Sequence, residues 1–204
     1  AADERPGGDA DAAERPDGPA AVVDEPLEGG DGTSLLAARQ VDLDAAGYVE
    51  TEHVVSGTAV SYTGDLPADG RFELSEGESA DYATRIVVRR PADAADFNGT
   101  VLVEWLNVSS GGDAAPDFTY MAPEILRGYA WVGMSVQHIG VEGGEVAVST
   151  GIEGTGAGLG LKGIDPERYG ELSHPGDAFA YDMYTQMARA LREPGDVDPL
   201  DGLD

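Results

Sequence analysis

Serine side chains are the first residues to consider for chemistry, because a serine nucleophile needs a recognisable local pattern. In hydrolases that pattern, Gly-x-Ser-x-Gly, forms a sharp turn between a strand and a helix. No such pentapeptide occurs in the 204-residue sequence. The nearest patterns surround Ser79, which lies in a polar segment, and Ser135, which lies inside a predicted strand. We therefore predict no catalytic residue of this kind in the chain.

Histidines are the next candidates, since imidazole is the usual acid or base near neutral pH. His53 lies within a predicted strand with no acid-base partner nearby in sequence, so packing in the sheet is the simpler interpretation. His138 follows Gln137 at the C-terminal end of a predicted strand, where open α/β sheets place ligands. His174 stands before the last predicted helix and beside a long loop. We predict that Gln137, His138 and His174 line a pocket.

Patterns for cofactors and metals are weak. The chain has no cysteine, which excludes disulfides, thiolate metal sites and a cysteine nucleophile. Residues 158–163 match Gly-x-Gly-x-x-Gly, but further glycines precede them and Asp165-Pro166 follows, where a dinucleotide site needs a strand and a helix. Residues 196–202 miss the calcium-loop spacing, since the fifth position is Leu200. We predict no cofactor and no metal.

Strands and helices alternate in the part of the chain that must position these residues. Short apolar runs rich in β-branched residues predict strands, and apolar residues four apart predict the last helix. The glycine-rich segment 140–170 is predicted to be a loop, and Gly57 is predicted to divide the first strand. The predicted strands are 48–62, 82–90, 100–106 and 129–136, and the predicted helices are 117–127 and 177–192.

Domain organisation follows from composition. Residues 1–33 hold almost no large apolar side chain, which predicts a disordered acidic tail. Residues 34–204 are predicted to form one domain, beginning with a short helical or extended stretch at 35–43. Strands 100–106 and 129–136 are apolar on both faces, as in a parallel sheet with helices on both sides. Such a sheet would be incomplete here, and its bare edge predicts that the rest of the protein accompanies this chain.

Several blocks together resemble a bacterial family of α/β-hydrolase domain proteins. They are the segment FNGTVLVEWLNVSSGG at 97–112, the segment LRGYAWVGMSVQ at 126–137, Gly140-Val-Glu-Gly143, the segment DPERYGELSHPGD at 165–177, and Tyr181-Asp182. They occur in the family's order, and the resemblance covers about residues 48–192. It implies a mostly parallel α/β-hydrolase sheet with helices on both faces, of which this chain is the N-terminal part.

The resemblance also implies a function. It implies a serine hydrolase that cleaves an ester or amide by acyl transfer, with the Ser-Asp/Glu-His triad beyond residue 204. In this fold one oxyanion-hole donor comes from the loop after the third strand. That mapping makes the backbone N–H groups of Val108 and Ser109 the candidates, with Asn107 and Ser110 as further pocket-lining candidates. The chain by itself is then expected to be inactive.

The net charge of the chain limits which partners and substrates it is expected to bind. Asp and Glu number 39 against 12 Lys and Arg, a net charge of -27, which argues against binding nucleic acid or an anionic membrane. A small neutral or cationic ester or amide is the expected substrate. The first residues, Ala1-Ala2-Asp3, look like a processed end, so a secreted or extracytoplasmic bacterial or archaeal protein is expected. The alternative is a non-catalytic acidic secreted binding or scaffold domain.

Overall fold

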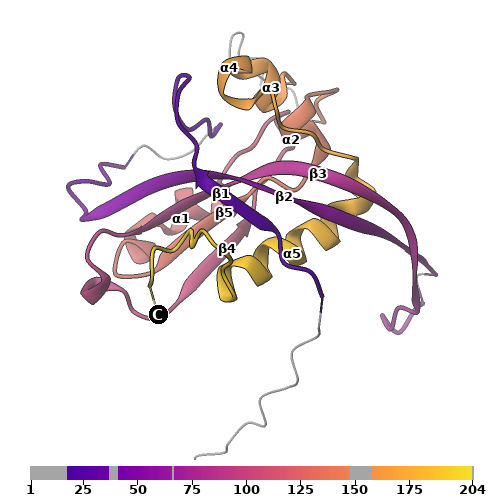
Figure 1. Cartoon of the computed structure of the whole chain (residues 1–204), viewed down its shortest axis with the longest axis horizontal. Helices are drawn as coiled ribbons and strands as arrows, with labels where there is room; N and C mark the ends of the chain where they lie inside the picture. The colour runs from indigo at the N-terminus through magenta and orange to yellow at the C-terminus, as the bar shows by residue number, and fades with distance from the viewer. Residues whose placement is uncertain (1–17, 37–40, 66, 148–157, 204) are drawn as a thin grey trace, which may run out of the picture.

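One five-stranded sheet, in the order β1-β2-β3-β5-β4, forms the centre of the molecule (Figure 1). The computed structural model describes residues 18–36, 41–65, 67–147 and 158–203. The strands are β1 (Val22–Pro26), β2 (Tyr48–Gly64), β3 (Leu74–Pro91), β4 (Val101–Trp105) and β5 (Ala130–Met134). The helices are η1 (Ala94–Asp96), α1 (Pro116–Ile125), α2 (His138–Glu142), α3 (Gly160–Ile164), α4 (Pro166–Tyr169), η2 (Asp177–Phe179) and α5 (Ala180–Arg192).

Strand pairing shows both the predicted arrangement and a difference from it. β4 and β5 are parallel neighbours joined through α1, as predicted for 100–106 and 129–136. β5 also pairs antiparallel with β3, as do β3 with β2 and β2 with β1. The described sheet is therefore mixed rather than mostly parallel. The reason is connectivity, because a hairpin joins β2 to β3 and only a crossover can make neighbours parallel. β4 lies at one edge of the sheet.

Helices cover both faces of the sheet, which confirms the predicted α/β class. Successive residues of β3 point to opposite faces, so Ile86 and Val88 pack toward α5 while Val87 packs toward α1. The predicted apolar stripe, Phe179 at the end of η2 and Met183, Met187 and Leu191 on α5, is buried against the first of these faces. On the second face α1 covers one part, and a separate cluster from α2, α3 and α4 covers another.

β1 corrects the prediction of a tail over residues 1–33. Residues 22–26 form a strand paired with β2, so disorder is the wrong prediction for them. Local composition could not reveal this, because the stabilising contacts are distant: Val23 is buried in the core shared with α5, and the Ala21 N–H donates to the Gln186 carbonyl at 3.0 Å. Residues 1–17 of the predicted tail lie outside the described residues.

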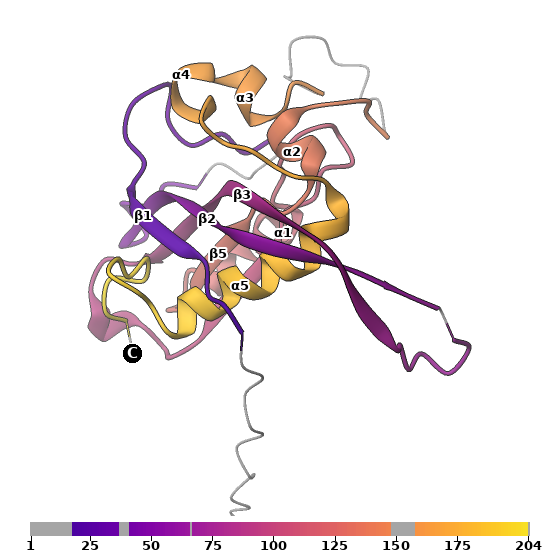
Figure 2. The same cartoon turned by 45° about the vertical axis from the view of Figure 1, so that its right-hand side comes forward.

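β2 and β3 form a long twisted hairpin whose far end projects from the body of the molecule (Figure 2). Gly57 does not divide β2, contrary to the prediction. A Cβ there would lie 2.7 Å from the Gln186 side-chain oxygen, so the glycine permits close approach of α5. β3 begins at Leu74, well before the predicted residue 82, since its polar first half pairs with β2 outside the core.

The glycine-rich segment 140–170 contains helices where a loop is predicted, namely the end of α2, then α3 and α4. Residues 148–157 lie outside the described residues, as do 37–40 of the predicted stretch 35–43. The described part of that stretch is extended at Leu36, which bridges to Ala114. Within the described ranges, no helix combines the length and apolar character needed to cross a bilayer.

Candidate active site

A pocket of about 620 Å³ opens beside the C-terminal ends of the parallel strands. The loop that follows β4 supplies Val108 and Ser109, and the turn that follows β5 supplies Gln137 and His138. Four of the seven predicted site residues therefore meet at one place, where open α/β sheets bind ligands. The described residues lining the pocket are completed by Ile139, Gly143, Gly144, Glu145, Ala147 and Asp177.

The loop after β4 is closed at its neck. Asn107 and Ala114 exchange two backbone hydrogen bonds, both of 2.9 Å, so the residues between them form a compact loop. Inside it the Gly111 N–H donates to the Val108 carbonyl at 2.8 Å. Gly111 has a φ of 83°, and a Cβ there would overlap Val146 and Gly158, so only glycine fits. We call residues 107–113 the oxyanion loop, after the predicted role.

The two predicted oxyanion donors differ in availability. The Ser109 N–H donates to the Asn107 side-chain oxygen at 3.0 Å, an Asx turn that engages this donor within the loop. For the Val108 N–H, the described part of the chain offers no acceptor. Val108 is buried while Ser109 is exposed. Of the two, the Val108 N–H is the one without an acceptor among the described residues, so it is the candidate donor to an oxygen of a bound molecule.

Asn107 and Ser110 belong to this loop but are not among the described lining residues, whereas Gln137 and His138 line the pocket. The Asn107 side chain is engaged by Ser109. Ser110 is half-buried, and neither it nor Asn107 is among the described lining residues. Gln137 is held on the pocket wall because its side-chain oxygen accepts from Trp105 Nε1 at 3.0 Å. His138 is held through its backbone N–H, which donates to Asp177 Oδ1 at 2.7 Å.

His174 lies behind His138 rather than on the pocket surface. It is buried, and the two imidazole rings meet edge to face with centroids 5.8 Å apart. The Gly176 N–H donates to His174 Nδ1 at 3.1 Å, so the ring proton must be on Nε2, which donates to the Val136 carbonyl at 3.0 Å. Burial lowers the pKa of His174 by more than the Val136 carbonyl and the nearby carboxylates raise it. The ring is a neutral structural link between β5 and η2.

Comparison with known protein families matches residues 23–204 to the family described as "Alpha/beta hydrolase domain". The chain belongs to the alpha/beta hydrolase domain family. The match confirms the resemblance seen in the sequence blocks, and it begins inside β1, a strand that sequence reasoning missed. Membership supports a hydrolase. No match is found among curated proteins or among solved structures.

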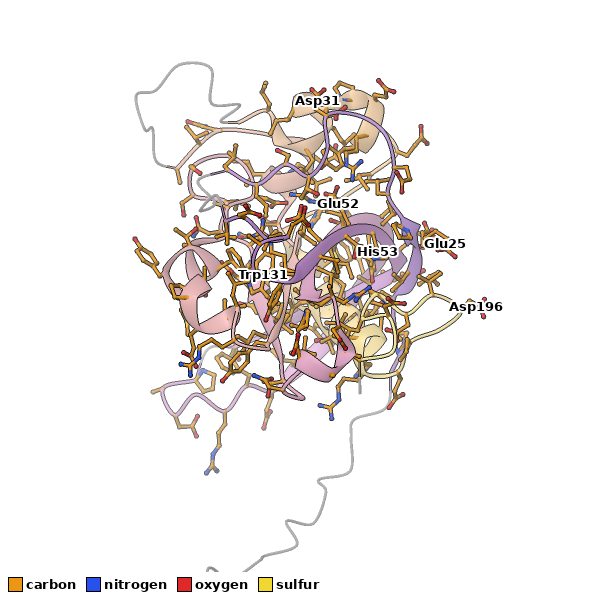
Figure 3. The ribbon with its side chains drawn as sticks, turned by 90° about the vertical axis from the view of Figure 1, so that its left-hand side faces the viewer. Glu25, Asp31, Glu52, His53, Trp131 and Asp196 are labelled. Atoms are coloured by element: carbon orange, nitrogen blue, oxygen red, sulfur yellow. The ribbon has the colours of Figure 1, made fainter. Side chains whose placement is uncertain are left out.

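In this alpha/beta hydrolase a buried charge cluster lies under the oxyanion loop. We define the Arg85 cluster as Arg85, Glu52, Asp113, Arg168 and Tyr169; Figure 3 marks the position of Glu52. Arg85 is fully buried and forms ion pairs with Glu52 and with Asp113, the latter at 3.1 Å. Arg168 pairs with Glu52 at 2.6 Å, and the Tyr169 hydroxyl donates to Glu52 at 3.0 Å.

Arg85 keeps its positive charge in this cluster. Burial lowers the pKa of Arg85, but Glu52 and Asp113 together raise it further, so the net pKa lies above its ordinary value. The cluster contains two guanidinium groups and two carboxylates, so the numbers of basic and acidic side chains are equal, as a buried ionic group requires. Strand alternation places Arg85 and its cross-strand neighbours on the same face as Val87, away from α5. Sequence analysis did not single out these residues, although Arg168 and Tyr169 lie in the block 165–177.

Two acidic residues near the pocket were also missed as site residues. Asp177 was assigned only to a helix start, yet it both lines the pocket and holds the His138 backbone. Glu142 accepts from the His174 N–H at 3.0 Å and pairs with Lys162 at 2.9 Å. Burial raises the pKa of Glu142, but these two donors lower it more, so its net pKa is depressed. The signal in the sequence that could have identified Glu142 and Asp177 was their position in the blocks 140–143 and 165–177, on which the family resemblance rests.

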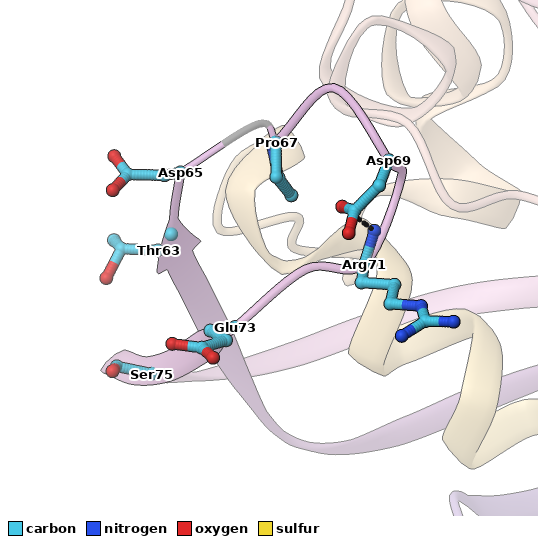
Figure 4. A pocket seen from close by; sticks show the side chains of 8 residues that line it. Thr63, Asp65, Pro67, Asp69, Arg71, Glu73 and Ser75 are labelled. Atoms are coloured by element: carbon cyan, nitrogen blue, oxygen red, sulfur yellow. Dashed lines mark hydrogen bonds between the residues drawn. The ribbon is translucent and has the colours of Figure 1, made fainter.

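A second pocket lies at the tip of the β2–β3 hairpin (Figure 4). Its side chains are Asp65, Asp69, Arg71, Glu73 and their neighbours, all from the end of this one hairpin. The Arg71 N–H donates to Asp69 Oδ1 at 3.1 Å, which is a local turn contact. This pocket lies far along the projecting hairpin from the strand ends, so we assign the candidate site to the pocket beside the oxyanion loop.

Proposed function

We propose that the protein is a serine hydrolase that cleaves an ester or amide by acyl transfer. In this proposal the chain supplies the oxyanion loop, and the Ser-Asp/Glu-His triad lies beyond residue 204. The single observation that carries the proposal is the Val108 N–H, which has no acceptor among the described residues and belongs to a pocket at the ends of parallel strands. The family membership agrees with this choice.

The proposed role of Val108 is electrostatic. Attack on an ester carbonyl creates an oxyanion, and a fixed N–H aimed at it stabilises the transition state more than the ground state. Loss of one such donor typically costs about 3 kcal/mol, or roughly 10²- to 10³-fold in kcat. The neck hydrogen bonds between Asn107 and Ala114 support a fixed donor position, since the loop is closed before substrate binds.

The proposed substrate is small and neutral or cationic. Among the described residues that line the pocket, the charged side chains are Glu145 and Asp177, and the nearby Lys162 is paired with Glu142. An anionic substrate would be repelled by this lining, as it would by the net charge of -27. Carboxylate-bearing esters are therefore expected to be poorer substrates than neutral esters of equal size.

We also propose that the remainder of the protein pairs with β4. In the described sheet β4 is hydrogen-bonded to β5 on one side only, and Val103 is 36% exposed. Trp105 contacts Tyr181 and Tyr184 of α5 beside this edge, with centroids 5.5 and 5.3 Å away. An apolar edge strand of this kind invites pairing. This supports a continuation or second chain seated against β4.

The test uses the full-length protein and the substitution Val108→Pro, which removes the N–H while keeping an apolar side chain. Hydrolysis of p-nitrophenyl butyrate and labelling by a fluorophosphonate probe are measured for both proteins. We expect an active wild type, a labelled serine beyond residue 204, and a kcat about 10²- to 10³-fold lower in Val108→Pro. Failure of the wild type to hydrolyse or label would refute the proposal and favour the non-catalytic binding domain.

The matched control is Ala68→Pro at the hairpin tip. There the Gly70 N–H donates to the Pro67 carbonyl at 3.1 Å, which makes Ala68 the second residue of a turn, where proline is favoured. This control should keep wild-type kcat. Equal losses in both variants would mean that proline itself, rather than the missing Val108 donor, is responsible.

A further inference from the structure

Asp113 joins the oxyanion loop to the Arg85 cluster. It lies just inside the loop neck, and its side chain turns inward and is almost completely buried. Its Oδ2 atom accepts from Ser135 Oγ in a short hydrogen bond and from Arg85 Nη2 at 3.1 Å. Gly140 of α2 lies against both Asp113 and Val108, since a Cβ there would overlap Asp113 Oδ1 and lie 3.1 Å from Val108 Cγ1. The anchor and the candidate donor are therefore packed together.

Arg85 is in turn held by several parts of the chain. Its Nη2 donates to the Ser34 carbonyl at 2.6 Å, and its Nη1 donates to Tyr169 at 3.2 Å and to Glu52. Its Nε donates to Ser135 Oγ at 3.1 Å. A planar guanidinium with all its nitrogens engaged has one allowed orientation. It can therefore fix Asp113 more firmly than a flexible ammonium group could.

We propose that Asp113 is a positioning residue that, held by Arg85 and Ser135, keeps the Val108 N–H aimed at the oxyanion. This inference rests on the proposed function, because it assigns a role toward the same reaction. The physical reason is that a misplacement of about 1 Å far from the reacting atoms can lower a rate about 100-fold. Asp113 is buried and is not among the described residues that line the pocket, so in this proposal it acts through the loop.

The test compares full-length wild type with Asp113→Asn, which keeps the side-chain shape but leaves two guanidinium groups facing one carboxylate. We expect kcat to fall about 10- to 100-fold with KM within about twofold, after the active fraction is fixed by fluorophosphonate titration. The matched control is Asp201→Asn. Asp201 also pairs with an arginine, Arg90 at 2.5 Å, but its side chain is 73% exposed. This control should keep wild-type kcat.

A second readout separates positioning from general support of the fold. A trifluoromethyl ketone forms a hemiketal oxyanion in the site, whereas the matching methyl ketone binds without one. Asp113→Asn should weaken inhibition by the first at least about tenfold more than by the second, since only the first uses the oxyanion donor. A merely structural role would weaken both equally, and that result would overturn the proposal.

Ser135→Ala keeps the inference testable if Asp113→Asn does not fold. It removes one donor from Asp113 and leaves the Arg85 pair, so we expect the same pattern at a smaller size, about 3- to 10-fold in kcat. An active wild type with unchanged kcat and unchanged inhibitor ratio in the folded variants would overturn the positioning role alone. An inactive wild type would overturn the proposed function, and the positioning role with it.

Discussion

Glu104 is a buried acceptor whose loss should have a measurable cost. It lies on β4 and is 4% exposed. Its Oε1 accepts from the Asp117 N–H, and its Oε2 accepts from the Phe118 N–H and from Trp131 Nε1, all at 2.9 Å. The N-cap residue of α1, Ala115, makes no side-chain cap. Glu104 therefore caps α1 from the neighbouring strand.

Glu104→Gln keeps the volume but offers only one oxygen to three donors. If that oxygen takes the place of Oε2, the new amide NH2 faces the Asp117 N–H, and one buried donor loses its partner at a cost of about 1–3 kcal/mol. The two remaining hydrogen bonds also lose their charge assistance, while the cost of burying a carboxylate disappears. We expect a net loss of about 1–3 kcal/mol in the free energy of unfolding at pH 7.

The measurement is urea unfolding, followed by circular dichroism and tryptophan fluorescence. The control is Glu124→Gln on the same helix, where the side chain is 54% exposed and pairs with Arg127 at 3.1 Å. Such a surface pair should be worth less than about 1 kcal/mol. A loss for Glu104→Gln no larger than that of the control would refute the capping role.

The contribution of Glu104 to stability should depend on pH with a definite sign. Burial raises the pKa of Glu104 by more than its three donors lower it, so the folded-state pKa is above the ordinary 4.5. A raised pKa contributes stability that is present below 4.5 and is lost as pH rises through the folded value. The stability difference between wild type and Glu104→Gln should therefore widen as pH falls toward 4.5.

Two further outcomes are expected. His174 has a lowered pKa, so its contribution to stability is present above pH 6.5 and is lost as pH falls below that value. Between pH 7 and 5, the free energy of unfolding of His174→Gln should therefore fall less steeply than that of wild type. An unchanged slope would contradict the assignment of a neutral His174. The Tyr48 hydroxyl accepts from the Gly128 N–H at 2.9 Å and lies 2.9 Å from the Ile125 carbonyl. Tyr48→Phe should lower the free energy of unfolding, measured in urea, by about 1–3 kcal/mol. If water replaces the hydroxyl, the loss should instead be under about 0.5 kcal/mol.

Local patterns predicted the elements that are held mainly by their own apolar runs. Segments 100–106 and 129–136 were predicted to be neighbouring strands, and they are β4 and β5. The stripe Phe179 to Leu191 predicted α5 because a helix buries one face every 3.6 residues. Placing Val108 and His138 at strand ends was enough to bring them to one pocket.

Features held by distant contacts were not predictable in the same way. β1 forms because it pairs with β2 and packs near α5, while its own residues are mostly exposed. Gly57 suggests a break until the approach of Gln186 is known. Arg85 looks like one more polar residue at the start of an apolar run. Only the fold shows that its partners lie on the segment between β1 and β2, on β2, on the oxyanion loop and on α4. The physical reason is that a buried charge is decided by its partners, which no local window contains.

The wide sequence spacing within the Arg85 cluster bears on the order of folding. Arg85 lies 28 residues before Asp113 and 84 before Tyr169, and Glu52 lies 116 residues before Arg168. Contacts of such long range form late, because closing the intervening chain costs entropy before any contact is gained. The contacts that α4 makes with Arg85 and Glu52 are therefore expected to complete the cluster after the shorter-range pair of Arg85 with Asp113. A ribosome-bound chain that ends before residue 168 holds Asp113, Arg85 and Ser135 but lacks Arg168 and Tyr169, which contact Glu52 and Arg85.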